Sequence, residues 1–218
     1  MQKAGYIVIW FSVKHECMKL ITVTGYKGGC GKSTTAIHLA TYFSDRGKTL
    51  LIDSDPNRTA IEWAKRGSLP FTVEDERKAI RLIPGCDYVI VDTPARPKSD
   101  DLKELADGCD LLVLPTIPDV VSLQPMLATA EDLPTSSNYR VLICIVPPYP
   151  SKEGEQMKAD LISGGVPVFN AMVRRTSGFG KAAIAGVPIK DIKDKSKTAW
   201  SDYQAVGKEI EEIINGQV

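Results

Sequence analysis

Short apolar runs rich in Val, Ile and Leu recur along the chain, without the polar alternation of a strand that has one face in water. This pattern is typical of strands buried on both faces of a parallel sheet. Amphipathic stretches of helical length separate the runs, which predicts an α/β domain with right-handed crossovers. We therefore predict a mostly parallel central sheet flanked by helices on both faces. The expected strands are 20–24, 49–52, 88–91, 111–114, 141–146 and 166–169. The expected helices are 32–46, 58–65, 99–107, 120–131, 155–163, 178–185 and 199–214.

The composition fits one such domain. The chain has 218 residues, of which 43% are hydrophobic and 25% are charged, so a wholly disordered, collagen-like or coiled-coil chain is a poor description. Lys plus Arg and Asp plus Glu both number 27, which argues against a strongly basic nucleic-acid binder but allows a local basic patch. We assign 18–218 to a single domain, and 1–17 to a variable leader or an extra edge strand. The five cysteines form no C-x-x-C pair, which indicates reduced thiols in a cytoplasmic protein.

The strongest local motif spans residues 25–34, Gly-Tyr-Lys-Gly-Gly-Cys-Gly-Lys-Ser-Thr, between an expected strand and an expected helix. It is similar to G-x-x-x-x-G-K-[ST], with five residues instead of four between the first glycine, Gly25, and Gly31. Its glycines allow conformations and close approaches that a Cβ would block. The backbone N–H groups can then point inward and form a phosphate cradle, which the helix N-terminus strengthens. Lys32 would place its charge against the β- and γ-phosphates, and the hydroxyl of Ser33 suits Mg²⁺.

Two more expected strands end in acidic residues. Asp53 and Asp55 close the segment 50–56, Leu-Leu-Ile-Asp-Ser-Asp-Pro, and Asp92 closes the apolar segment 88–92. Carboxylates at the mouth of a buried strand are costly unless a cation is near, and Mg²⁺ is the obvious candidate. The alternative is that one of the acids at 53 and 55 caps the helix that begins near residue 58.

The second lysine of the loop, Lys27, makes the segment resemble the deviant Walker A of the ParA/MinD family of partitioning ATPases. The residues 53–56 resemble the family's D-x-D-P segment, and 88–92 resembles a Walker B strand. The resemblance covers most of the chain from Met18 and implies a P-loop NTPase fold that binds ATP and Mg²⁺. It departs from the family at Cys30, where valine is commoner, and at Asn57, where glutamine is usual.

The resemblance also implies roles for single residues. Lys27 would reach across a homodimer to the partner's ATP, Lys32 would neutralise phosphate charge, and Asp55 would orient the attacking water. The implied metal site comprises Ser33, Asp53 and Asp92. The adenine would lie between late loops that contain Pro147 and Pro188, although ordinary turn prolines explain these equally well. The implied nucleotide contacts are Lys27, Gly28, Gly29, Cys30, Gly31, Lys32, Ser33, Thr34, Pro147 and Pro188.

The segment 171–197 carries seven basic residues against two acidic ones. Such a segment can bind DNA phosphates without reading sequence, as ParA-like proteins do, or it can be a solvated surface. The expected DNA-binding residues are Arg174, Arg175, Lys181, Lys190, Lys193, Lys195 and Lys197. The final expected helix has an apolar stripe, but its polar face is acidic and would be repelled by anionic lipid. We therefore expect it to dock on the domain core, and we expect no membrane binding.

Together these features predict an ATPase, weak alone, that dimerises on ATP and binds nucleoid DNA nonspecifically in the cytoplasm. An adaptor protein would stimulate hydrolysis, and the cargo would be a plasmid, a chromosome or an organelle such as a carboxysome. The alternative is an ATP-dependent protein switch without DNA binding. A small-molecule synthetase of the same superfamily is a third hypothesis, against which Lys27 argues.

Overall fold

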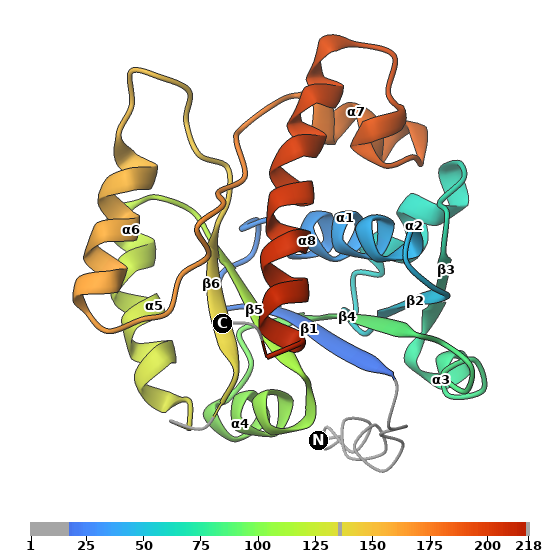
Figure 1. The fold of residues 1–218 in the computed structure, drawn as a ribbon, viewed down its shortest axis with the longest axis horizontal. Helices are drawn as coiled ribbons and strands as arrows, with labels where there is room; N and C mark the ends of the chain where they lie inside the picture. The colour runs from blue at the N-terminus through green and yellow to red at the C-terminus, as the bar shows by residue number, and fades with distance from the viewer. Residues whose placement is uncertain (1–17, 135–136, 217–218) are drawn as a thin grey trace.

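The computed structural model describes residues 18–134 and 137–216 (Figure 1). The prediction made for 1–17 lies outside these residues. Among the residues described, no helix is both long enough and apolar enough to span a bilayer.

The structure is built on one six-stranded sheet whose neighbouring strands are all parallel, in the order β3-β2-β4-β1-β5-β6. This confirms the predicted fold class. The strands are β1 (Lys19–Gly25), β2 (Thr49–Asp53), β3 (Thr72–Asp75), β4 (Tyr88–Ala95), β5 (Leu111–Thr116) and β6 (Tyr139–Ile143).

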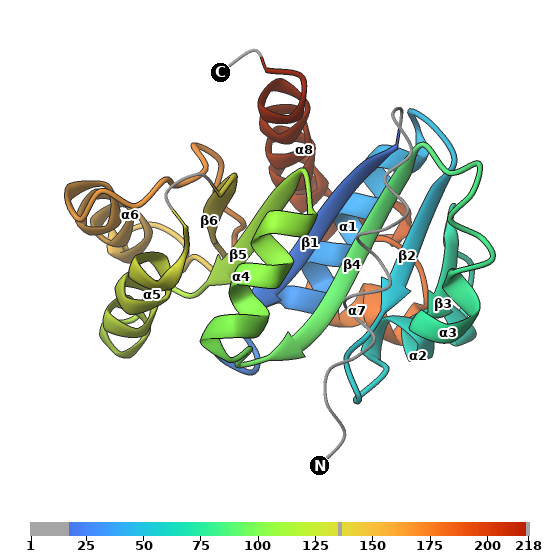
Figure 2. The ribbon, with the colours of Figure 1, turned by 90° about the horizontal axis from the view of Figure 1, so that it is seen from below.

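Helices cover both faces of this sheet (Figure 2). On one face lie α1 (Lys32–Ser44), α2 (Thr59–Arg66), α7 (Gly178–Ala185) and α8 (Trp200–Ile214). On the other lie α3 (Glu76–Ala79), α4 (Ser99–Gly108), α5 (Val120–Asp132) and α6 (Glu153–Ser163). Two short 3-10 helices, η2 (Ile189–Asp191) and η3 (Lys195–Ala199), precede α8.

The two hydrophobic cores explain why the strands are apolar at successive positions. Successive side chains of a strand point to opposite faces. Thus Ile21 and Val23 pack with α1 and α8, whereas Leu20 packs in the other core with α4. Because both faces are covered, the buried strands need no polar side, as the sequence pattern predicts.

Two strand predictions need correction. The segment 166–169 is not a strand: Val168 forms a single parallel bridge to Val141 and nothing longer. Conversely, β3 was not predicted from the sequence. It is an edge strand with the sequence Thr-Val-Glu-Asp and is only partly buried, so it lacks the apolar run that marks the other strands.

The last helix docks on the core, as predicted. Tyr203, Val206 and Ile210 of α8 are buried against α1. Gly207 allows the close approach of the two helices, because a Cβ there would lie 2.4 Å from the ring of Tyr42. The acidic face also has partners, since Glu211 accepts a hydrogen bond of 2.6 Å from the Tyr42 hydroxyl.

Candidate functional site

The loop between β1 and α1 is shaped for an anion. Gly29 and Gly31 have φ values of 80° and 94°, which side chains other than glycine rarely adopt. Gly31 is the N-cap of α1 and offers no side chain to cap it, so the N–H groups of the first turn can donate to a ligand. Gly25 closes the other end of the loop. A Cβ there would lie 2.9 Å from Cys30 Sγ and 3.1 Å from Cδ of the buried Lys32.

The carboxyl end of β4 brings Asp92 to this loop. Asp92 pairs in register with Val23 of β1 and with Asp53 of β2. Its side chain is buried, and neither carboxylate oxygen has a hydrogen-bond partner within the described part of the chain. Burial is the main cause that raises the pKa of Asp92 to about 7. The Ser33 hydroxyl, which lies near the carboxylate without meeting hydrogen-bond geometry, and the charge of Lys32 oppose the shift. The charges of Asp53 and Asp55 add to it.

A buried carboxylate without a partner is the feature that a bound cation would relieve. The neighbouring Ser33 hydroxyl adds a second oxygen donor. In the region described, no group of three or more His, Cys, Asp or Glu residues forms a metal cluster. Mg²⁺ does not need one, because it is usually held by one or two carboxylates together with waters and phosphate oxygens. Asp92 and Ser33 therefore fit Mg²⁺ bound together with a phosphate ligand.

Asp53 is also buried, but its carboxylate already has partners. Its Oδ1 accepts from the N–H of Asp55 at 3.2 Å, and its Oδ2 accepts from the N–H of Ile61 at 3.0 Å in the first turn of α2. Burial raises the pKa of Asp53, and these hydrogen bonds oppose the shift. The helix-capping alternative thus describes Asp53, and of the two carboxylates only that of Asp92 lacks hydrogen-bond partners among the described residues.

The loop after β2 has an anchor that was not predicted from the sequence. Arg58 donates from its guanidinium to both carboxylate oxygens of Glu76, at 2.6 and 2.9 Å, and to the carbonyl oxygen of Asp53. This two-point contact ties the loop that carries Asp55 to α3. A lone arginine eighteen residues before a glutamate gave no sequence signal for the contact.

Three residues with positive φ, other than glycine, follow strands at the same edge of the sheet. Arg58 follows β2, Arg96 follows β4 and Ile145 follows β6, with φ values of 51°, 59° and 58°. A β-branched residue such as Ile145 is disfavoured in this conformation. Conformations of this kind concentrate at functional sites, and the three loops lie at the edge of the sheet that also carries Asp53 and Asp92.

Lys27 lies in the phosphate loop, residues 25–34, and forms an ion pair within the same chain. Its Nζ lies 3.3 Å from Asp119 Oδ2, and its side chain is 45% exposed. Asp119 is also the N-cap of α5, since its Oδ1 accepts from the N–H of Ser122 at 2.6 Å. In the described monomer, Lys27 is therefore directed toward α5.

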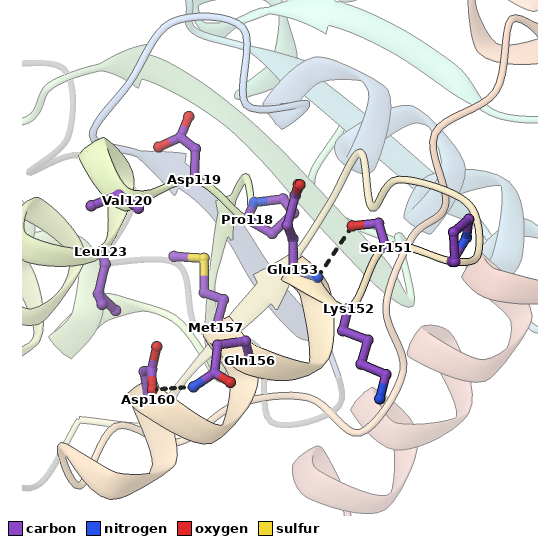
Figure 3. A pocket seen from close by; sticks show the side chains of 11 residues that line it. Pro118, Asp119, Val120, Leu123, Ser151, Lys152, Glu153, Gln156, Met157 and Asp160 are labelled. Carbon is purple, nitrogen blue, oxygen red and sulfur yellow. Dashed lines mark hydrogen bonds between the residues drawn. The ribbon is translucent and has the colours of Figure 1, made fainter.

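A groove of about 510 Å³ runs between α5 and α6 beside this ion pair (Figure 3). Asp119 and Val120 lie on one wall, and Glu153 and Met157 lie on the other. Its lining also includes Asp160 and a single basic residue, Lys152, so acidic groups outnumber basic ones.

A smaller cavity of about 170 Å³ adjoins the phosphate loop. Its lining comes from the start of α1, from the residues directly after β6, from the segment before α7, from α7 and from α8. These residues are Gly31, Thr34, Cys144, Ile145, Val173, Arg174, Arg175, Thr176, Phe179 and Tyr203. The adenine was expected between the loops that contain Pro147 and Pro188, and neither proline lines this cavity. Pro188 is buried and precedes Ile189, whose N–H donates to His38 Nε2 at 3.0 Å. Phe179 and Thr176 also line the cavity and were not among the predicted residues, because neither residue type near a helix start predicts a ligand contact.

Three of the seven basic residues in the segment 171–197 form ion pairs, so fewer of its charges are unpaired than the sequence indicates. Arg174 pairs with Asp202 at 2.5 Å, Lys181 with Asp194 at 2.5 Å and Lys190 with Asp45 at 3.3 Å. Lys181 is the main cause that lowers the pKa of Asp194 to about 2. The expected residues that have no ion pair within the described ranges are Arg175, Lys193, Lys195 and Lys197, all of them exposed.

Comparison with known proteins gives a consistent result. Residues 21–189 match the model of the CobQ/CobB/MinD/ParA nucleotide binding domain. The chain is 32% identical over 203 residues to maintenance of carboxysome distribution protein A of Gloeobacter kilaueensis, covering 88% of this chain and 94% of that protein. It is 30% identical over 179 residues to protein ParA of Rhizobium radiobacter, covering 73% of this chain and 80% of that protein.

The fold resembles that of a Cyanothece McdA variant in complex with ATP, with a TM-score of 0.65 and 17% identity, over 91% of this chain and 97% of that one. The loop geometry, the parallel sheet and the family match agree with one another. The chain belongs to the CobQ/CobB/MinD/ParA family of nucleotide-binding domains and has its P-loop NTPase fold.

Proposed function

We propose that this protein hydrolyses ATP to ADP and phosphate at the edge of the sheet formed by β1, β2 and β4. The observation that carries the proposal is Asp92, a buried carboxylate without hydrogen-bond partners among the described residues, beside the phosphate loop. Bound Mg²⁺ would neutralise developing charge on the β- and γ-phosphates. Lys32 and the N–H groups of the loop bind the same phosphates, and Asp55 orients the attacking water. Phosphoryl transfer to water needs this alignment and charge neutralisation more than covalent help.

The proposal includes an ATP-bound homodimer in which Lys27 completes the partner's site. Lys27 is exposed at the edge of the sheet where the phosphate loop lies, and its ion pair with Asp119 is of the exposed kind that contributes about 0–1 kcal/mol. Leaving Asp119 for the partner's phosphates therefore costs little. The two residues after Asp119 are exposed valines: Val120 is 87% accessible and Val121 is 73% accessible. They offer apolar area to a second protomer.

The output that we propose is the positioning of carboxysomes or plasmids, by an ATP-bound dimer that binds DNA nonspecifically and associates with the nucleoid. Support comes from the names of the two relatives, and from the exposed basic residues that keep no ion pair within the described ranges. An adaptor protein would stimulate hydrolysis, and the acidic lining of the groove between α5 and α6 suits a basic adaptor segment. The second candidate is an ATP-dependent protein switch without DNA binding. It is favoured by the three basic residues that intramolecular ion pairs neutralise.

Two variants test the enzymatic part. Lys32→Ala removes the charge at the phosphates, so we expect it to lose binding of a fluorescent ATP analogue. Asp55→Ala should bind the analogue normally, release phosphate slowly and remain dimeric in ATP by light scattering. A normal rate of phosphate release by Asp55→Ala would remove this residue from the mechanism.

DNA binding separates the two candidate outputs. With ATP and Mg²⁺, we expect retention of duplex DNA of unrelated sequences, weakening steeply as salt rises. Charge reversal at Lys193 and Lys197 should weaken retention at every sequence. Reversal at Lys208 of α8, outside the basic segment, serves as the matched control. Absence of ATP-dependent retention at low salt would favour the switch.

A further inference from the structure

The carboxylate of Asp55 is held by one nearby residue. Asp55 is buried, with 6% of its surface exposed. Its Oδ1 accepts two hydrogen bonds from Asn57, one from the backbone N–H at 2.9 Å and one from the side-chain Nδ2 at 2.9 Å. Its Oδ2 accepts no hydrogen bond from any residue in the described ranges. Of the two carboxylate oxygens, only Oδ1 is thus fixed by hydrogen bonds from the described residues.

We infer that Asn57 is a positioning residue for ATP hydrolysis. Its side-chain amide fixes Oδ1 of Asp55 and leaves Oδ2 as the oxygen that accepts the hydrogen bond of the attacking water. This inference rests on the proposed function, in which Asp55 orients that water.

The physical need for such a residue follows from the aspartate side chain. The terminal torsion of an aspartate is broad and nearly two-fold, so a carboxylate without contacts can turn. Two donors on one oxygen restrict that rotation. Because a catalytic contact tolerates little misplacement, holding the carboxylate plane raises the fraction of productive geometries.

The loop that carries Asn57 is itself fixed, which makes the contact effective. The N–H of Arg58 donates to the carbonyl oxygen of Asp55 at 2.9 Å and closes the turn. The guanidinium of Arg58 then binds Glu76 of α3 through both carboxylate oxygens. Asn57 therefore acts from an anchored turn.

Substitutions at Asn57 distinguish positioning from a purely structural role. Aspartate has nearly the shape of asparagine, so a role in packing alone predicts that Asn57→Asp behaves like the wild type. A positioning role predicts the opposite, because a carboxylate cannot donate to Asp55 and repels it. Asn57→Ala removes one donor and keeps the backbone N–H, and Asn57→Gln keeps an amide donor on a longer arm.

The experiment measures single-turnover phosphate release with enzyme in excess, and ATP-analogue affinity, on the full chain. We expect the hydrolysis rate to fall about 3- to 10-fold in Asn57→Ala, the size that the net loss of one ordinary hydrogen bond gives. In Asn57→Asp the rate should fall more than about 10-fold, because a second carboxylate also repels Asp55. Asn57→Gln should recover to within about threefold of the wild type, and affinity for the analogue should change less than about twofold in all three. Asn170→Asp, a surface change outside the site, is the matched control and should leave both quantities unchanged.

Two results would overturn the inference. One is a wild-type hydrolysis rate in Asn57→Asp. The other is a loss of rate that follows a loss of thermal stability across the three variants, with Asn57→Asp the least affected. Asp55→Ala separates the two levels of the argument. If that variant hydrolyses ATP normally, the proposed role of Asp55 fails, and the role of Asn57 with it. If Asp55→Ala is inactive while the Asn57 variants keep their rate, only the positioning role fails.

Discussion

Replacing Asp92 by asparagine is expected to stabilise the nucleotide-free protein, and to do so more as the pH rises. Asp92 is buried without hydrogen-bond partners among the residues described, and burial raises its pKa to about 7. The folded protein therefore keeps a proton on this carboxyl group at pH values where the unfolded chain has lost it. Stability is full below the ordinary aspartate pKa and falls as the pH rises through the folded value.

The size of the effect follows from the two pKa values. Between the ordinary value of 3.8 and about 7, each pH unit lowers the free energy of unfolding by about 1.4 kcal/mol. Over pH 5 to 8 the contribution of Asp92 is therefore about 2–3 kcal/mol, and it levels off above the folded pKa. An asparagine at this position has no such titration.

The assay is urea unfolding of wild type and Asp92→Asn in EDTA, at several pH values from about 5 to 8. The difference between the two proteins is required, because His38 titrates with the opposite sign. Burial lowers the pKa of His38 to about 4, so its contribution raises stability as the pH rises toward the ordinary value of 6.5. This contribution cancels between wild type and variant.

A difference in unfolding free energy that stays flat from pH 5 to 8 would refute the reasoning, since Asp92 would then not be a buried, uncompensated carboxylate. A second readout uses the ligand. Mg²⁺ with an ATP analogue should raise the free energy of unfolding of the wild type above that of Asp92→Asn. The unfolding free energy of Asp92→Asn should change little when Mg²⁺ is added.

Further predictions concern the packing around the site. Gly207→Ala should lower the free energy of unfolding by about 1–3 kcal/mol in urea, because a Cβ would lie 2.4 Å from the Tyr42 ring; a neutral effect would show that α8 can shift. Between about pH 6.5 and 4, the wild type should lose up to about 3 kcal/mol of unfolding free energy that His38→Gln keeps, whatever the effect of the substitution at neutral pH. The same pH dependence in both proteins would show that protonation of the buried His38 is not the cause of this loss. Gly186→Ala should unfold at lower urea than the wild type, since a Cβ would lie 2.1 Å from the backbone nitrogen of Gly67 and φ is 69°; equal midpoints would contradict this close approach.

Much of the architecture was predictable because it follows from local rules. Runs of Val, Ile and Leu predicted five of the six strands, since strands buried on both faces cannot alternate. The phosphate loop was predictable because its glycines are required by backbone conformation within a single short segment. The edge strand β3 was not predicted, because it is only partly buried and its sequence contains no apolar run.

The site was predictable only in part, for a different physical reason. Sequence placed Asp53 and Asp92 at strand ends, which the parallel register brings side by side. It could not tell that Asp53 caps α2 while Asp92 stays without a partner among the described residues, since this depends on how the loop after β2 folds back. Nor could it show that acidic residues distant in sequence neutralise Arg174 and Lys190.

The sequence by itself determined most of the strand and helix order, the glycine-rich loop after β1 and the two strand ends that carry acidic residues. These depend on periodicity, on glycine conformation and on the parallel arrangement, all of which are set by short-range chemistry. Only the tertiary structure decided which charged side chains form ion pairs and which remain unpaired, whether buried or exposed. Electrostatic energy depends on distance and burial, and both are properties of the folded chain. Lys27 beside Asp119 is therefore a contact that the fold, not the motif, defines.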